Sequence, residues 1–251
     1  RETRRMTQVR AGAEADVNNR QLIMTYLLAI DTATKVCSAA LFKDDKLLAV
    51  KEEKGDFSHA KNLAVFTDLL LKEGEVTSTE LSGIIVSKGP GSYTGLRIGV
   101  SFAKGLCYAL KIPLISIDTL HALALGFTDA KKDSFDLICP MIDARRMEVY
   151  ASIFNNSLEV VKPISADVIY SGSYSEIIKD QSIVFIGDGA IKCKTLLTAK
   201  RRTFITDFLP SAAYLGKEGF RKFKKADNEN VAYFEPYYLK EFIALKGKRL
   251  V

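Results

Sequence analysis

The hydrophobic pattern is most informative around residues 84–103. The β-branched run 84–86 predicts a buried parallel strand, because both faces of such a strand are covered. It leads into a glycine-rich stretch at 89–99, and residues 100–103 then have helical spacing. The pattern predicts a strand, a tight turn and a helix, with Ser92 or Thr94 as the helix cap.

The helix after this turn carries small residues at every fourth position, namely Gly95, Gly99 and Ala103. Each interior glycine destabilises a helix by about 1 kcal/mol relative to alanine, so the stripe needs a reason. It could pack closely on its own sheet, pack against a partner helix, or leave helix N–H groups free for a phosphate. It is not a P-loop, because no Lys followed by Ser or Thr comes after the last glycine.

The segments before this stretch predict further elements. Residues 26–31, 36–42 and 46–50 predict a three-stranded meander, and residues 58–73 predict a helix that Gly74 ends. Apolar residues occupy nearly the whole circumference of this helix. It must therefore be covered on more than one side, either by the rest of the chain or by another subunit.

The first unit recurs in the second half of the chain. Residues 139–155 repeat residues 27–43 without a gap, so that Asp31 aligns with Asp143. A strand and glycine turn at 183–190 echo the earlier strand and glycine stretch. A unit of meander, helix, strand, turn and helix is therefore predicted to occur twice.

Composition adds limits to this picture. The 251 residues are 47% hydrophobic and 26% charged, with a net charge of +6, which is typical of a globular protein. Residues 1–23 are expected to be a disordered extension before a true start at Met24. Two lobes are expected at 24–118 and 119–232, and a C-terminal segment with a basic tail at 233–251. No apolar run is long enough for a membrane span and no signal peptide is evident, which favours the cytoplasm.

Residues that could catalyse a reaction are scarce. Neither His59 nor His121 is followed four positions later by a second histidine, so a metal-binding His-x-x-x-His pair is absent. The four cysteines have no metal spacing and are expected to be buried thiols. No Gly-x-Ser-x-Gly elbow occurs. We expect no metal, no cofactor and no catalytic residue.

Four motifs resemble those of a known family. They lie at 28–34, 89–99, 143–150 and 187–190. Together they are similar to the TsaB (YeaZ) family, within the superfamily of actin, sugar kinases and heat-shock ATPases. The resemblance runs from about Met24 to 236–240, where Lys240 replaces the family's closing Arg. It implies an α/β, two-lobed, duplicated actin/sugar-kinase-like (ribonuclease H-like) fold, with mixed sheets flanked by helices.

The resemblance implies a scaffold rather than an enzyme. Members are the dimerisation subunit of the bacterial enzyme that makes N6-threonylcarbamoyladenosine at position 37 of tRNAs. The implied partners are a TsaD-like catalytic subunit, a TsaE-like ATPase and, through the complex, tRNA. Alone, the chain is expected to form a homodimer. The alternative is a stand-alone ATP-binding phosphotransferase or ATPase of the same superfamily.

The partner interface is expected on the two predicted helices of the first lobe. Its predicted residues are His59, Leu63, Phe66, Leu70, Gly91, Ser92, Tyr93, Thr94, Gly95, Arg97, Ile98, Gly99, Phe102 and Ala103. Leu63, Phe66 and Leu70 would be the buried anchors, and the small residues would set the distance of approach. Replacing Gly95 or Gly99 by Leu is expected to block pairing and leave the fold mostly intact.

Nucleotide binding is a second expectation, because the superfamily holds ATP phosphates between two turns that each begin with Asp. The corresponding residues here are Asp31, Thr32, Asp143, Gly187 and Gly189. Ala33 stands where active members commonly have the Gly that permits close approach, so ATP hydrolysis is not expected. Arg145 and Arg146 either meet a phosphate or partner carboxylate, or form a solvated hairpin tip. Basic clusters at 200–202, 221–225 and 246–249 are either a contribution to tRNA affinity or plain surface charge.

Overall fold

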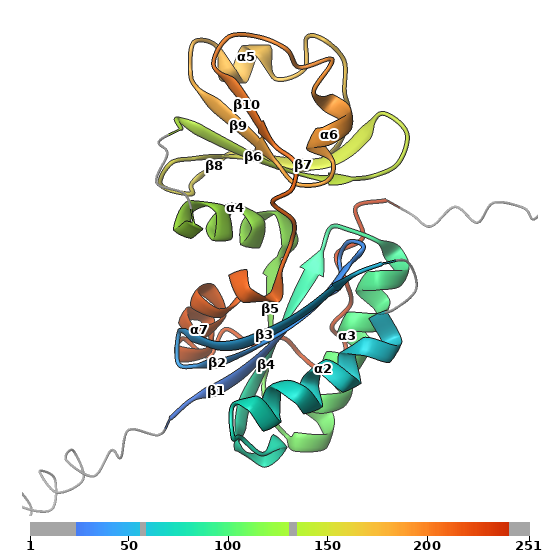
Figure 1. The fold of residues 1–251 in the computed structure, drawn as a ribbon, viewed down its shortest axis with the longest axis vertical. Helices are drawn as coiled ribbons and strands as arrows, with labels where there is room; N and C mark the ends of the chain where they lie inside the picture. Colours follow the sequence, from blue (N-terminus) through green and yellow to red (C-terminus); the bar gives the residue numbers. More distant parts are fainter. Residues whose placement is uncertain (1–23, 56–58, 131–134, 241–251) are drawn as a thin grey trace, which may run out of the picture.

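The computed structural model describes residues 24–55, 59–130 and 135–240. The predicted disordered extension, the predicted helix start at Ser58 and the distal part of the basic tail lie outside the described residues. The chain forms two lobes, each built on one five-stranded sheet (Figure 1). None of the described helices is both long enough and apolar enough to cross a bilayer.

The first sheet has the strand order β3-β2-β1-β4-β5. Its strands are β1 (Tyr26–Asp31), β2 (Val36–Lys43), β3 (Lys46–Lys54), β4 (Leu81–Gly89) and β5 (Leu114–Asp118). β1 pairs antiparallel with β2 and parallel with β4, so the sheet is mixed. The predicted meander is confirmed, although β3 runs on to Lys54 because it pairs with β2 as far as Val36.

The second sheet repeats this arrangement, with the order β8-β7-β6-β9-β10. Its strands are β6 (Leu137–Asp143), β7 (Glu148–Asn155), β8 (Val160–Val168), β9 (Ile183–Ile186) and β10 (Arg202–Ile205). β6 pairs antiparallel with β7 and parallel with β9, as β1 does with its own neighbours. The predicted duplication and the predicted fold class are therefore confirmed.

Helices cover both faces of the first sheet. α2 (His59–Glu73) and α3 (Tyr93–Leu110) lie on one face, and α7 (Gly216–Lys224) lies on the other (Figure 1). Alternate residues of β1 serve the two faces: Leu28 and Ile30 pack towards α2 and α3, while Leu27 and Ala29 join the opposite core. This double burial explains the continuous apolar runs of β1 and β4.

The second lobe has much shorter helices. α5 (Ser175–Ile178) and α6 (Ala190–Cys193) have four residues each, where α2 has 15 and α3 has 18. Only residues 169–182 connect β8 to β9, so α5, which takes the place of α2 in this order, is short. The two copies therefore share a sheet but differ in their helices.

α4 (Thr119–Ala130) lies between the two sheets (Figure 1). Glycine often ends a helix, but α4 continues past Gly126 to Ala130. A Cβ atom on Gly126 would lie 2.2 Å from the ring of Tyr214, so this glycine permits close packing and does not end the helix.

The chain returns to the first lobe after the second sheet. Two short 3-10 helices complete the structure, η1 (Ser78–Glu80) before β4 and η2 (Ala212–Tyr214) before α7. The N–H of Ala212 in η2 donates to Ser38 Oγ of β2 (2.9 Å), and α7 follows on the same face of the sheet. η2 and α7, which fall within the predicted second lobe at 119–232, thus help to cover the first sheet. The predicted lobe boundaries stay a prediction.

Candidate functional site

The turn between β1 and β2 is closed. Asp31, Thr32 and Ala33 are exposed by only 1%, 2% and 0%. The Asp31 carboxylate accepts a hydrogen bond from the N–H of Ala33 (2.9 Å), which tightens the turn. Asp31 and Thr32, which the sequence predicts as nucleotide contacts, have no face open to a ligand in this structure.

α3 and the residues just before it close this turn, and their glycines permit the close approach. A Cβ atom on Gly91 would lie 2.3 Å from the carbonyl oxygen of Ala33, and one on Gly95 would lie 2.1 Å from that of Thr32. A Cβ atom on Gly99 would lie 2.2 Å from Thr32 Oγ1, and this hydroxyl donates to the Gly95 carbonyl (2.8 Å). The stripe therefore packs within its own lobe. The expectation that Gly95→Leu would leave the fold mostly intact is wrong, because even a methyl group lacks space there.

Side chains at the N-terminus of α3 are held in place by one another. Ser92 caps the helix, as predicted, by accepting a hydrogen bond from the N–H of Gly95 (3.3 Å). The ring of Tyr93 contacts that of Tyr238, with centroids 4.8 Å apart. The Arg97 guanidinium lies 5.5 Å from the centre of the Tyr93 ring, within the range of a cation–π contact.

Two buried side chains beside the first turn have an unpaired polar atom. Among the described residues, Oδ2 of Asp31 and Nδ1 of His59 are the buried side-chain atoms without a hydrogen-bond partner. Burial raises the pKa of Asp31 to about 6, while the hydrogen bond from Ala33 lowers it. His59 Nε2 lies 2.7 Å from the carbonyl oxygen of Thr34, and the ring is 8% exposed. His59 thus holds the turn and does not face outward.

The predicted anchors on α2 divide into two groups. Leu63 and Leu70 are 0% exposed and belong to the core beneath the helix, so in this structure they support the sheet and are not available to a partner. Ala103 of α3 is equally buried. Phe66 is only partly buried at the margin of the same core.

The outward sides of α2 and α3 nevertheless carry large apolar side chains. Val65 is 49% exposed, Leu69 43% and Tyr108 83%. Ile98 and Phe102 of α3 are partly buried at the margin of the core beneath the helices. We call these outward sides the outer face; its residues are Val65, Phe66, Leu69, Thr94, Arg97, Ile98, Phe102 and Tyr108.

The turn between β6 and β7 is open to solvent. The N–H of Ala144 donates to the Glu148 carbonyl (3.1 Å) and closes a hairpin with Arg145 and Arg146 at its tip. Both arginines are exposed and have positive φ angles, 69° and 47°. Asp143 Oδ1 accepts a hydrogen bond from the N–H of Arg145 (2.9 Å). The pair lies at an exposed hairpin tip, and its contact with a phosphate or partner carboxylate stays a prediction.

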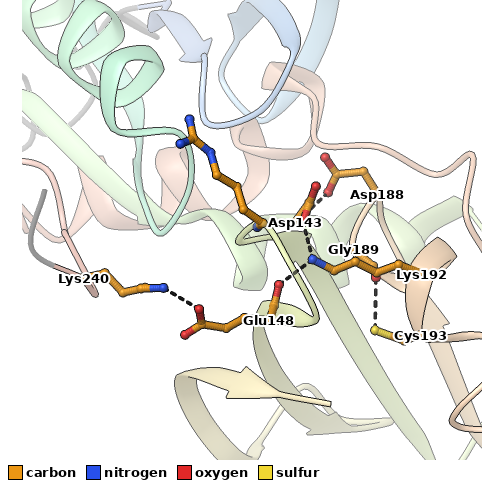
Figure 2. Close-up of polar contacts among 8 residues, drawn as sticks. Asp143, Glu148, Asp188, Gly189, Lys192, Cys193 and Lys240 are labelled. Atoms are coloured by element: carbon orange, nitrogen blue, oxygen red, sulfur yellow. Dashed lines mark hydrogen bonds and ion pairs between the residues drawn. The ribbon is translucent and has the colours of Figure 1, made fainter. Parts of the chain in front are cut away.

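Lys192 of α6 neutralises this turn, as Figure 2 shows. Its ammonium group pairs with the Asp143 carboxylate and donates to the Glu148 carbonyl (2.6 Å). Asp188 Oδ1 accepts a hydrogen bond from the N–H of Asp143 (3.1 Å), and burial raises the pKa of Asp188. The carboxylate of Glu148 pairs with Lys240 near the end of the described chain.

The remaining predicted nucleotide contacts lie beside Asp143. Gly187 has a φ of 98°, and a Cβ atom there would lie 2.3 Å from the Met141 carbonyl oxygen. A Cβ atom on Gly189 would lie 2.8 Å from the carbonyl carbon of Ile142. Both glycines thus let the loop after β9 lie against β6. The structure brings Asp143, Gly187 and Gly189 together in one lobe and places Asp31 and Thr32 in the closed turn of the other.

Comparison with known proteins shows the family. The sequence profile of the family described as "TsaD: tRNA N6-adenosine threonylcarbamoyltransferase" matches residues 53–246. The Bacillus subtilis (strain 168) protein named "tRNA threonylcarbamoyladenosine biosynthesis protein TsaB" is 33% identical over 196 residues, which are 76% of this chain and 79% of that protein. The chain belongs to the TsaB family.

Two further similarities agree with the TsaB assignment. The protein of the same name from Haemophilus influenzae is 26% identical over 234 residues, 88% of this chain and 95% of that protein. A solved Pseudomonas aeruginosa protein, described as similar to the peptidase YeaZ, has a TM-score of 0.75 at 24% identity and covers 86% of this chain and 100% of its own. That structure supports the fold, and the family predicted from the four motifs is confirmed.

Several residues of this TsaB-family chain were missed by sequence reasoning. Val65, Leu69 and Tyr108 were not among the predicted interface residues, although the apolar circumference of α2 was the signal for the first two. The ion pairs of Lys192 and Lys240 were not predicted, because pairs between residues distant in sequence leave no local pattern.

Proposed function

We propose that the chain is the non-catalytic subunit that pairs with a TsaD-like catalytic subunit, so that adenosine 37 of tRNA is threonylcarbamoylated. A TsaE-like ATPase is the third component, and tRNA is reached through the complex. The relatives named as TsaB threonylcarbamoyladenosine biosynthesis proteins support the pathway. The match to the TsaD profile supports pairing between subunits of related fold.

One observation carries the proposed docking site. The inner sides of α2 and α3 are fully used by the sheet, yet Val65, Leu69 and Tyr108 point outward with 43–83% of their surface exposed. Val65 and Leu69 are neighbours at i and i+4 on α2. Exposed apolar side chains next to one another are typical of protein interfaces, and tyrosine is enriched there. The outer face is therefore our candidate for the partner interface, and for the contact between two copies when the chain is alone.

The two turns support a non-catalytic role. Asp31 is buried inside a closed turn, and the carboxylate of Asp143 is already paired with Lys192. Neither acidic group is free for a phosphate-bound cation.

The described basic residues of α7 give tRNA binding little support of their own. Lys217 pairs with Asp129, Arg221 with Glu218 and Lys222 with Asp227, so three of the four basic side chains of α7 are paired within the chain. Contact with tRNA therefore depends mainly on the partner.

Light scattering coupled to size-exclusion chromatography tests the proposal. The chain is measured alone and mixed with the TsaD-like subunit of the same organism, and a one-to-one complex that replaces a self-dimer is expected. Leu69→Glu should abolish this complex, because it would bury a charge in an apolar interface. Leu48→Glu on β3 is the matched control, since Leu48 is 44% exposed and Leu69 is 43% exposed.

Two outcomes would overturn the proposal. Absence of any complex, with or without the ATPase subunit, would limit the relationship to sequence and fold. Equal effects of Leu69→Glu and Leu48→Glu would remove the docking role from the outer face.

A further inference from the structure

The residues after α7 form a long irregular segment on the first lobe. We call residues 225–240 the strap. It has no helix or strand beyond an isolated bridge between Glu229 and Leu114, and it passes beside α3 (Figure 1). A segment without its own secondary structure needs specific contacts to stay in one place.

Such contacts fix the first half of the strap. The N–H of Glu229 donates to the Leu114 carbonyl (2.8 Å) at the edge strand of the sheet, and the Glu229 carboxylate accepts from Ser116 Oγ (2.5 Å). Further on, Lys104 of α3 donates to the carbonyl oxygen of Phe234 (2.8 Å). The side chain of Phe234 packs against the core beneath α3. The strap is thus attached both to the sheet and to α3.

The second half of the strap crosses the start of the glycine-rich stretch, at Lys88 and Gly89. The N–H of Tyr237 donates to the Lys88 carbonyl (2.7 Å), and a Cβ atom on Gly89 would lie 2.7 Å from the Tyr237 carbonyl oxygen. Gly89 therefore leaves space for the strap. One residue later, the ring of Tyr238 lies on that of Tyr93 at the start of α3, next to Arg97 of the outer face.

The strap then reaches the second lobe. Lys240 pairs with the carboxylate of Glu148, the first residue of β7. The carbonyl of Glu148 accepts from Lys192, which also pairs with Asp143 (Figure 2). A continuous series of contacts thus runs from Tyr93 through the strap to the open turn of the second lobe.

We propose that the strap couples the outer face to the second-lobe turn. A subunit docked over Arg97 and Tyr93 fixes Tyr238 in place, and Lys240 then holds the hairpin from Asp143 to Glu148. The pair between Lys240 and Glu148 is partly exposed, with 43% and 21% of the side-chain surfaces accessible. Such pairs form and break readily, so a modest ordering of the strap changes how often the pair is formed.

Hydrogen–deuterium exchange on the full chain tests this coupling, which rests on the proposed docking function. In the complex with the TsaD-like subunit, exchange should slow at 93–97 and also at the hairpin 143–148, relative to the chain diluted until the self-dimer has dissociated. Lys240→Gln should keep the first effect and lose the second. Lys72→Gln is the control, because Lys72 pairs only within α2, with Asp68, and it should behave as the unaltered chain does.

The free chain gives a second, independent measurement. There, Lys240→Gln should speed exchange at the hairpin about threefold, since the weak pair to Glu148 is lost. Failure of the unaltered chain to bind the subunit would overturn the proposed function but leave this measurement standing. Unchanged hairpin exchange in free Lys240→Gln, or a docked Lys240→Gln whose hairpin is as protected as that of the unaltered chain, would overturn the coupling.

Discussion

The first-lobe turn at Asp31 and the second-lobe turn at Asp143 occupy equivalent positions in two sheets of the same strand order, yet their acidic residues have opposite surroundings. Asp31 is 1% exposed, and one of its oxygens has no hydrogen-bond partner. Asp143 is exposed, and its carboxylate pairs with Lys192. The first turn is closed by packing, whereas the second is neutralised by charge.

The helices explain this difference. α3 has 18 residues, and its glycine stripe lets it cover the first turn completely. α6 has four residues and cannot cover the second turn, but it places Lys192 beside Asp143. Two sheets of the same topology can therefore differ in the chemistry of their turns, because the helices that pack beside those turns differ.

Gly95→Ala should have the largest effect on this comparison. The new Cβ atom would lie 2.1 Å from the Thr32 carbonyl oxygen, which is backbone and cannot turn aside. We expect the free energy of unfolding to fall by about 3 kcal/mol, measured by urea unfolding. Gly105→Ala in the same helix is the control, because no atom lies within 4 Å of that Cβ position. It should stabilise the chain by about 0.5 to 1 kcal/mol, and equal losses in both variants would disprove the packing argument.

Asp31→Asn should have the next largest effect and the opposite sign at neutral pH. The pKa of Asp31 rises from 3.8 to about 6 on burial, so the folded state favours the protonated acid. Its contribution to stability is complete below pH 3.8 and is lost as the pH rises through about 6. Asn cannot ionise and keeps an acceptor for Ala33, so it should stabilise the chain above that pH by about 2 to 3 kcal/mol.

Urea unfolding across this pH range checks the Asp31 prediction. The unaltered chain should lose stability relative to Asp31→Asn between pH 3.8 and about 6, and the difference should then stay constant. A variant that is less stable at every pH would show that the buried carboxylate makes a favourable contact.

The fold was largely predictable from the sequence. Continuous apolar segments indicate strands buried on both faces, and glycine-rich segments indicate the turns after them. The constant offset between Asp31 and Asp143 was enough to predict the duplication. The lengths of the helices were harder to predict from the sequence. Glycine often ends a helix, but Gly126 lies inside α4, where the ring of Tyr214 leaves no space for a side chain. No local pattern in the sequence reveals that contact.

The candidate site was predictable only in part. An apolar side chain on a helix that is apolar all round can face the sheet or the solvent. For this reason Leu63 and Leu70 were expected in the partner interface, while Val65 and Leu69, which are exposed, were left out of it. The glycine stripe was correctly singled out, but the atoms that approach it belong to Thr32, which is distant in sequence.

Lys192→Met should have the smallest effect, and its sign should oppose that of Asp31→Asn. Methionine keeps much of the apolar stem but removes the charge that Asp143 and the Glu148 carbonyl now share. Because 49% of the Asp143 side chain is exposed, water replaces part of the lost pair, and we expect a loss of only about 1 kcal/mol.

Salt dependence separates charge from packing at Lys192. The loss in Lys192→Met should shrink at high salt, because screening already weakens the pair in the unaltered chain. Lys72→Met, which breaks the more exposed pair with Asp68, is the control and should change stability by less than about 0.5 kcal/mol. A salt-independent loss would mean that Lys192 acts through its stem. The second turn would then be closed by packing as the first one is, and the contrast between the lobes would fail.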